Sequence, residues 1–246
     1  MHFAPTLLEL FKSLTIMSAF LSSRKVAIVG GGSVGSALAN AIVQSKTDDK
    51  AASAVIAARD VAKTKAALAE KKLEHLIVEE KDEAIANADI LILAVPGAHT
   101  DEGIHEIAKS LGNNLDGKLI IDATNPLSSF PDGLQVRWGN VGGGTSGGEV
   151  LQQALPNSKI YKAFNTLGVE HMVNPVGKHM LYAGPDKDIE PLLLAIGYVP
   201  YYVGPIRYAR NLEAMAELWI HAAIPPLPAA QLGRDWTFAI VGNPEK

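Results

Sequence analysis

The chain has 246 residues, of which 48% are hydrophobic and 20% charged, and its formal net charge is −4 at pH 7. This composition suits a globular protein with one large domain, or one domain with a smaller appendage, and it lacks the basic excess of a nucleic-acid-binding protein. Because the chain has no cysteine and its seven histidines show no metal-ligand spacing, we expect neither disulfides nor a metal site, and any redox chemistry must come from a bound organic cofactor.

The first 23 residues precede the first predicted strand and carry two short apolar runs interrupted by Glu9 and Lys12. Neither run approaches the roughly 18 apolar residues that a membrane-spanning helix needs. This extension could be a transit peptide, a docked helix or a disordered leader, and Met17 offers an alternative start. We therefore expect a cytoplasmic protein without a transmembrane segment, or an organellar one if the extension is a transit peptide.

From Lys25 onward, short aliphatic runs alternate with helical patterns, which is typical of βαβ units and a parallel sheet. Val26 to Val29 form a continuous run suited to burial on both faces. Six strands, the number of a full dinucleotide-binding fold, are predicted at residues 25–30, 54–57, 77–79, 90–95, 119–122 and 159–164. The predicted fold class is α/β, with a Rossmann-like doubly wound parallel sheet over residues 24–166.

A segment rich in Gly, Ser and Pro separates the fifth and sixth strands, and it predicts an irregular loop over 126–149 with a helix only from Gly148 to Leu155. Beyond Phe164 the pattern predicts a smaller C-terminal α/β subdomain and tail over residues 167–246. Its elements are helices at 169–173, 189–196 and 207–221 and strands at 179–183 and 199–203, with Pro225 ending the last helix.

The strongest local motif is the GxGxxG from Gly30 to Gly35, which follows a buried strand and opens a helix, the context that dinucleotide binding requires. Gly30 permits the tight turn, Gly32 leaves room for the pyrophosphate, and Gly35 lets the helix approach the sheet. The helix N-terminus offers free N–H groups and a partial positive charge. We expect the cofactor to bind at Gly30, Gly32, Ser33, Val34 and Gly35.

The residue at the end of the second strand determines whether a Rossmann domain prefers NAD or NADP. An acidic residue there would bind the ribose hydroxyl and repel a phosphate, whereas this chain has Arg59, whose guanidinium can hold the 2′-phosphate. Lys63, four residues on, would lie on the same helix face. Asp60 could instead cap the helix, or face the ribose and favour NAD. The sequence therefore favours NADP(H).

Three further strand ends should frame the nicotinamide, because ligands bind outside the carboxyl ends of strands in open α/β sheets. The expected contacts are Ala94, Val95 and Pro96 at the fourth strand, Ala123 and Asn125 at the fifth, and Ala163 and Asn165 at the sixth. Each Asn could equally be a turn or cap residue. No catalytic residue can be assigned; the candidates are Asn165, Asn125 and His99, with Trp138 and His171 as further candidates to line the substrate pocket.

These segments together resemble a known family, the NADP oxidoreductases that use the 5-deazaflavin coenzyme F-420, whose nucleotide domain is also similar to the reductase domain of the STEAP metalloreductases. The resemblance is carried by VAIVGGGSVGSALA, AARD, LAVP, KAFNTLGVEHMVNP, MLYAGPDKD and YVGPIRYARNLEAMAELWI, which cover most of the chain from Lys25 to His221. It implies NADP(H) as cofactor and a flavin or coenzyme F-420 as co-substrate. Ala58 stands where members usually carry Ser or Thr, which removes one hydrogen bond to a 2′-phosphate.

Three functions are compatible with this sequence. Hydride transfer between NADPH and a flavin or deazaflavin needs parallel stacking and a short transfer distance rather than a strong acid or base. Direct reduction of a small imine or carbonyl, as in pyrroline-carboxylate reductases, would require a proton donor and usually a large helical dimerisation domain. The third possibility is a non-catalytic NADP-binding protein. The Asn, Ala, Pro and Gly residues at the strand ends favour the first.

The last predicted helix carries a broad apolar stripe formed by Leu212, Met215, Leu218 and Trp219. Such a stripe must be covered by the chain's own sheet or by a partner. Because the similar reductases are generally dimers, we expect a homodimer.

Overall fold

The computed structural model describes residues 23–47, 50–51, 53–130, 133–136, 145–225 and 231–242. The main sheet consists of β1 (Val26–Val29), β4 (Ala54–Ala58), β5 (Ile77–Glu80), β6 (Ile90–Leu93), β7 (Leu119–Asp122), β10 (Lys159–Lys162), β11 (His179–Ala183) and β12 (Val199–Gly204). The helices are α2 (Ser33–Gln44), α3 (Val61–Glu70), α4 (Lys81–Asn87), α5 (Asp101–Ser110), α6 (Gly147–Ala154), α7 (Val169–Val173), α8 (Glu190–Ile196) and α9 (Ala209–Ala223), with a 3-10 turn η1 at Ile206–Tyr208.

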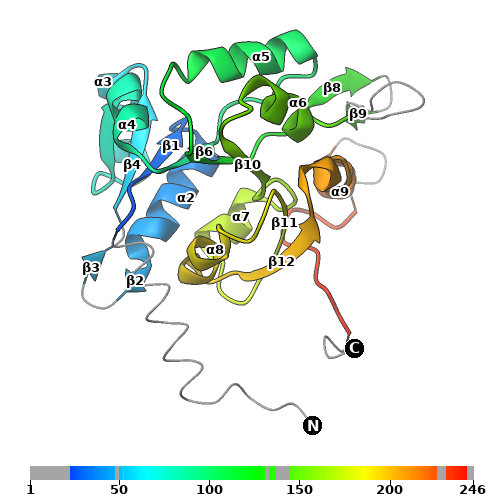
Figure 1. Cartoon of the computed structure of the whole chain (residues 1–246). Helices are drawn as coiled ribbons and strands as arrows, with labels where there is room; N and C mark the ends of the chain where they lie inside the picture. The colour runs from blue at the N-terminus through cyan, green and yellow to red at the C-terminus, as the bar shows by residue number, and fades with distance from the viewer. Residues whose placement is uncertain are drawn as a thin grey trace, which may run out of the picture.

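The eight strands lie in the order β12-β11-β10-β7-β6-β1-β4-β5 (Figure 1). Six neighbouring strands of this sheet are all parallel: β5, β4, β1, β6, β7 and β10. Renumbered one to six along the chain, they stand in the Rossmann order 3-2-1-4-5-6. The order reverses at β1, which pairs with β4 on one side and β6 on the other. This topology confirms the predicted fold class, and it places the switch point beside the glycine turn.

Alternate residues of each central strand enter two different cores, as burial on both faces requires. Val26 and Ile28 face one core, which α2, α3, α7 and α8 cover, whereas Ala27 and Val29 face the other, which α4, α5 and α6 cover. Helices therefore lie on both faces of the sheet (Figure 1).

The C-terminal elements extend the same sheet in the reverse direction. β11 is antiparallel to β10, and the two strands share only the pair Lys162 and Ala183. β12 is parallel to β11 along its length. Because Lys162 ends β10 and Ala183 ends β11, most of β11 projects beyond the carboxyl end of β10. The core over α2 also includes Met180 and Leu192, so the predicted subdomain shares a hydrophobic core with the Rossmann strands.

Several element boundaries differ from the sequence predictions. Two of the missed elements are hairpins, β2 (Lys46–Thr47) with β3 (Lys50–Ala51) and β8 (Leu127–Phe130) with β9 (Gly133–Val136), and the second occupies part of the loop predicted to be irregular. β6 ends at Leu93 and β10 at Lys162, earlier than predicted. Short polar strands carry little hydrophobic periodicity, which explains why the sequence did not reveal the hairpins. No helix of the described residues is long and apolar enough to cross a membrane.

The apolar stripe of α9 is covered mostly by the chain itself. Leu212, Ala216 and Trp219 are buried, whereas Leu218 is 58% exposed. Trp219 stacks on Trp236 of the C-terminal tail at 6.0 Å between ring centroids, and its Nε1 donates to the Trp236 carbonyl oxygen. Of the four stripe residues, Leu218 is therefore the exposed one, and the chain itself covers most of the others.

Candidate active site

The glycine turn between β1 and α2 is shaped by close backbone approach. Gly30 has φ +118°, and a Cβ there would lie 2.5 Å from the Ala94 carbonyl oxygen. A Cβ at Gly35 would lie 1.8 Å from the Gly30 carbonyl oxygen, so only glycine allows α2 to begin this close to the turn. Gly32, in contrast, has open space on its side-chain side.

The first turn of α2 is open to a ligand. Gly32 is the N-cap and provides no side-chain cap, and the first turn contains no acidic residue. The leading N–H groups of a helix have no partner within the helix, and they attract anions together with the helix dipole. Gly32 and Ser33 are exposed, Val34 is half-buried and Gly35 is buried. The turn thus has the form of an anion-binding site at the switch point of the sheet.

Arg59 follows β4 directly, and the pairing of Ala57 with Val29 brings it level with the glycine turn. Asp60 caps α3, because its Oδ1 accepts from the Lys63 N–H at 2.8 Å. Of the two roles considered for Asp60, helix capping and contact with the ribose, the structure shows helix capping. Arg59 precedes this cap, so the expectation that it shares a helix face with Lys63 is wrong. Both basic side chains are exposed, and among the described residues Arg59 has no hydrogen-bond or ion-pair partner.

The ends of β6, β7 and β10 meet at the same edge of the sheet, since these strands are parallel neighbours. The loop after β6 presses on the loop after β7: a Cβ at Gly97 would lie 2.0 Å from the Asn125 carbonyl oxygen. The predicted contacts at this edge differ in exposure. Pro96 is exposed, Ala94, Val95, Ala123 and Asn125 are half-buried, and Ala163 and Asn165 are buried.

Asn125 and Asn165 contact each other across this edge. The Asn165 Nδ2 donates to the Asn125 Oδ1 at 3.0 Å and to the Leu212 carbonyl oxygen at 3.0 Å, and the Asn125 Nδ2 donates to the Asn165 carbonyl oxygen at 3.2 Å. Within the described part of the chain, the buried Asn165 Oδ1 accepts no hydrogen bond. The pair keeps unused hydrogen-bonding capacity beside the strand ends.

Phe164 produces the turn that brings Asn165 to this position. Its φ is +66°, which is a strained value for a bulky residue, and it is completely buried. Its N–H points to the Met180 Sδ at 3.2 Å instead of continuing the ladder of β10. This conformation ends β10 two residues before the predicted boundary. Strain of this kind costs about 1–3 kcal/mol and is found preferentially at functional sites.

A buried charge network beneath the site escaped the sequence analysis. The Lys162 Nζ lies 2.6 Å from the Asp122 Oδ2 and 2.9 Å from the Glu213 Oε1, and none of the three side chains is more than 3% exposed. Burial disfavours the charge of Lys162, but the two carboxylates outweigh it, so the pKa of Lys162 lies above its ordinary value. A partial sequence signal existed: Lys162 and Asp122 are charged residues at the ends of two buried strands, and in the sheet they pair in register.

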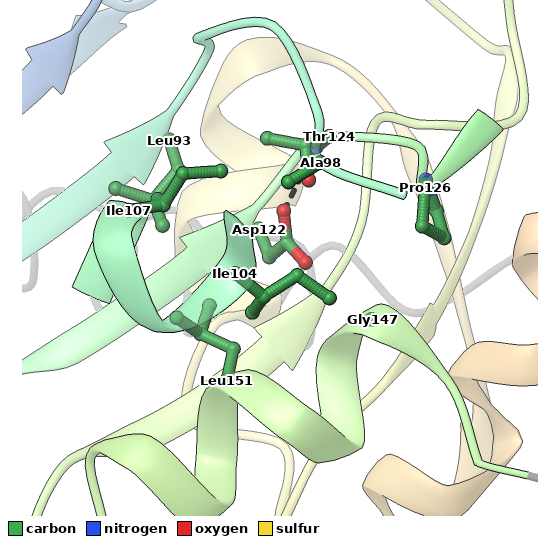
Figure 2. Close-up of a pocket in the computed structure, with 9 residues that line it drawn as sticks. All are labelled: Leu93, Ala98, Ile104, Ile107, Asp122, Thr124, Pro126, Gly147 and Leu151. Atoms are coloured by element: carbon green, nitrogen blue, oxygen red, sulfur yellow. Dashed lines mark hydrogen bonds between the residues drawn. The ribbon is translucent and has the colours of Figure 1, made fainter. Parts of the chain in front are cut away.

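A small cavity lies above Asp122, between α5 and α6 (Figure 2). Asp122 contributes the one charged group among the residues that line it, and its Oδ1 accepts from the Thr124 N–H at 2.9 Å. The other lining residues are mostly apolar: Leu93, Ala98, Ile104, Ile107, Thr124, Pro126, Gly147 and Leu151. The turn after β7 therefore combines a hydrogen bond to Asp122 with a small, mostly apolar cavity.

The histidines named as candidates lie apart from one another. His99 is exposed just before α5, and His171 is buried in α7, where its Nε2 has no hydrogen-bond partner among the described residues. Trp138 lies outside the described residues. Those residues contain no cluster of three or more His, Asp or Glu side chains suited to a metal ion.

A parallel sheet whose strand order reverses at a glycine turn, with an open helix N-terminus beside it, defines the class of Rossmann dinucleotide-binding domains. Residues 25–126 match the family described as NADP oxidoreductase, coenzyme F-420-dependent. The resemblance to this family predicted from the sequence is confirmed, and it makes the chain an NADP-dependent oxidoreductase. The similarity to the STEAP reductase domain stays a prediction, and no curated protein matches the chain significantly.

Solved structures share the fold. A protein of Arthrobacter sp. that carries the provisional name of F-420-dependent NADP-reductase is 24% identical, with a TM-score of 0.70 over 89% of this chain and 100% of its own. A hypothetical protein of Sinorhizobium meliloti is 25% identical, with a TM-score of 0.60 over 78% and 90%. A reductive aminase of Aspergillus terreus, solved with NADPH4, cyclohexanone and allyl amine, is 18% identical, with a TM-score of 0.51 over 81% and 64%.

Two alanine substitutions in the glycine turn should separate folding from binding. Gly35→Ala places a Cβ against the Gly30 carbonyl oxygen and should lower the free energy of unfolding by about 1–3 kcal/mol or more, as overpacking does. Gly32→Ala meets no atom within 4 Å, so it should keep the wild-type melting temperature and weaken NADPH binding by about tenfold, equivalent to one charge-assisted hydrogen bond. Thermal unfolding and NADPH titration measure both, and full NADPH affinity in folded Gly32→Ala would contradict the pyrophosphate assignment.

Proposed function

We propose that the chain binds NADP(H) along the carboxyl edge of its sheet and transfers hydride between the nicotinamide and a flavin or a deazaflavin such as coenzyme F-420. The pyrophosphate would lie on the first turn of α2, the 2′-phosphate near Arg59 and Lys63, and the nicotinamide among the ends of β6, β7 and β10. The observation that carries this proposal is the alignment of the open glycine turn with the exposed Arg59 at the switch point.

The charges at the end of β4 support NADP(H) over NAD(H). Arg59 is free among the described residues to hold a phosphate through charge-assisted hydrogen bonds. Asp60, the acidic residue that could favour NAD, uses its Oδ1 to cap α3. A 2′-phosphate here would therefore meet two exposed cations, Arg59 and Lys63, beside a carboxylate that is already engaged.

The strand ends support a reaction that depends on positioning. A dihydronicotinamide supplies a hydride, which an acceptor ring takes up, while the accompanying proton can come from water. The protein has to stack the two rings at a short distance. Asn125 offers an amide at the edge where the nicotinamide carboxamide would lie. Lys162, Asp122 and Glu213 are ionisable but buried and bonded to one another, so they are not available to exchange protons with a substrate.

Two other functions remain as alternatives. Direct reduction of an imine or carbonyl is the better supported, because the reductive aminase of Aspergillus terreus shares the fold. The match covers 64% of that enzyme's chain, and the C-terminal elements of the present chain are mixed α and β instead of a large helical domain. A non-catalytic role in NADP binding is the third possibility. All three share the NADP(H) site and differ in the acceptor.

An acceptor panel tests the proposed reaction. NADPH oxidation should be followed by absorbance with free flavins, a deazaflavin, and small cyclic imines and ketones as acceptors. We expect turnover with one of the ring acceptors. Turnover with imines alone would favour the reductive alternative, and NADPH binding without turnover by any acceptor would favour the non-catalytic one.

Removal of the arginine at the end of β4 tests cofactor choice. Arg59→Ala should weaken NADPH binding by about 1.5–3 kcal/mol, the value of a hydrogen bond to a charged group, and leave NADH binding almost unchanged. Lys65→Ala is the matched control, since Lys65 is also an exposed cation but lies further along α3. Titration of each variant with both cofactors gives the comparison. Equal losses for NADPH and NADH in Arg59→Ala would refute the phosphate assignment.

We also propose that the protein is a homodimer. Leu218 is 58% exposed on α9, and Met215 beside it is half-buried, so this end of the helix keeps some apolar surface. Light scattering should give about twice the chain mass of 26.1 kDa. A monomer at micromolar concentration would show that the stripe packs only within its own chain.

A further inference from the structure

The buried Lys162 ammonium makes three contacts that together use all of its donors. Its Nζ lies 2.6 Å from the Asp122 Oδ2, 2.9 Å from the Glu213 Oε1 and 2.9 Å from the Thr124 carbonyl oxygen. A lysine ammonium has three N–H donors and no acceptor. Because these are occupied and the side chain is completely buried, Lys162 cannot donate to a substrate. Lys162 can therefore affect a ligand only through the residues that it contacts, which are Asp122, Thr124 and Glu213.

The group of interest is the turn after β7, residues 123–126, which carries Asn125. Thr124 is held at both of its backbone polar atoms: its N–H donates to the Asp122 Oδ1, and its carbonyl oxygen accepts from Lys162. Thr124 and the buried Pro126 also line the small cavity (Figure 2). The two hydrogen bonds to Thr124 thus help to fix the position of this turn, together with the close approach of Gly97 and the hydrogen bonds between Asn125 and Asn165.

Helix α9 completes the arrangement from the far end of the chain. The Glu213 carboxylate accepts from the N–H groups of Gly147 and Gly148 at 3.0 and 3.1 Å, which ties α9 to the start of α6. The preceding residue of α9, Leu212, accepts from the Asn165 Nδ2. Two consecutive residues of α9 thus hold residues at the end of β10: Leu212 holds Asn165, and Glu213 holds Lys162.

We propose that Lys162 is a positioning residue that holds the 123–126 turn, and with it Asn125, in place for the nicotinamide half of the cofactor. This inference rests on the proposed function, because it takes NADP(H) as the ligand. It separates the cofactor site into two parts. The glycine turn and Arg59 bind the adenosine and pyrophosphate half and do not depend on Lys162, whereas the nicotinamide half does.

The test compares whole NADPH with adenosine 2′,5′-bisphosphate, a fragment that reaches only the adenosine half of the site. In Lys162→Met, the dissociation constant of NADPH should rise by about tenfold, as expected for one lost contact. That of the fragment should stay within about twofold, because the backbone near Arg59 is unchanged. The kcat with the acceptor that the wild type reduces should fall. Lys159→Met is the matched control, because it removes a lysine of the same strand that pairs with Asp186 and Asp188.

Breaking a buried ion pair is strongly destabilising, so Lys162→Met alone could fail to fold. The triple variant Lys162→Met, Asp122→Asn, Glu213→Gln leaves no unpaired buried charge and still lacks the donor to Thr124. It should fold, as judged by circular dichroism and a cooperative melting transition, and show the same selective loss of NADPH.

Unchanged NADPH binding in either folded variant, or an equal loss of NADPH and fragment, would overturn the positioning role. A similar selective loss in Lys159→Met would overturn it as well, because the effect would then not depend on the buried network. If the wild-type protein binds neither ligand, the proposed function itself is refuted and this inference falls with it.

Discussion

The contact on which the rest of the site depends is the approach of Gly35 to the Gly30 carbonyl oxygen, where a Cβ would sit at 1.8 Å. This contact allows α2 to start directly at the end of β1, and β1 is the strand at which the order of the sheet reverses. The helix N-terminus, the end of β4 with Arg59, and the end of β6 consequently meet in one place. A larger residue at Gly35 would move the helix away from all of them.

The strands of the Rossmann unit could be predicted because they are buried on both faces, which demands continuous aliphatic runs such as Val26 to Val29. The C-terminal strands and helices were found by the same signals. The direction of the C-terminal strands could not be predicted, because no local sequence pattern shows that β11 runs antiparallel to β10. The strain at Phe164 was also hidden, since a bulky residue with positive φ is held by its surroundings and not by its own preference.

The candidate site divides in the same way. The glycine turn and Arg59 have local signatures, and the structure brings them together as the strand order requires. The Lys162, Asp122 and Glu213 network joins residues up to 91 positions apart in the chain, and only the register of Lys162 with Asp122 could have hinted at it. Long-range polar contacts depend on tertiary structure that a single sequence does not display. Glu213 on α9 is the clearest example, because its spacing is that of an ordinary helix residue.

The reversed direction of β11 has a consequence for the stereochemistry of any hydride transfer at this edge. Since β10 and β11 pair only at Lys162 and Ala183, the first residues of β11 extend beyond the end of β10 and form a wall beside Phe164, whose N–H contacts the Met180 Sδ. A nicotinamide ring placed against this wall would present one prochiral face to the protein and the other to the open side of the edge. Transfer would then be confined to a single diastereotopic hydrogen at C4, selected by the topology of the sheet without any acidic or basic side chain.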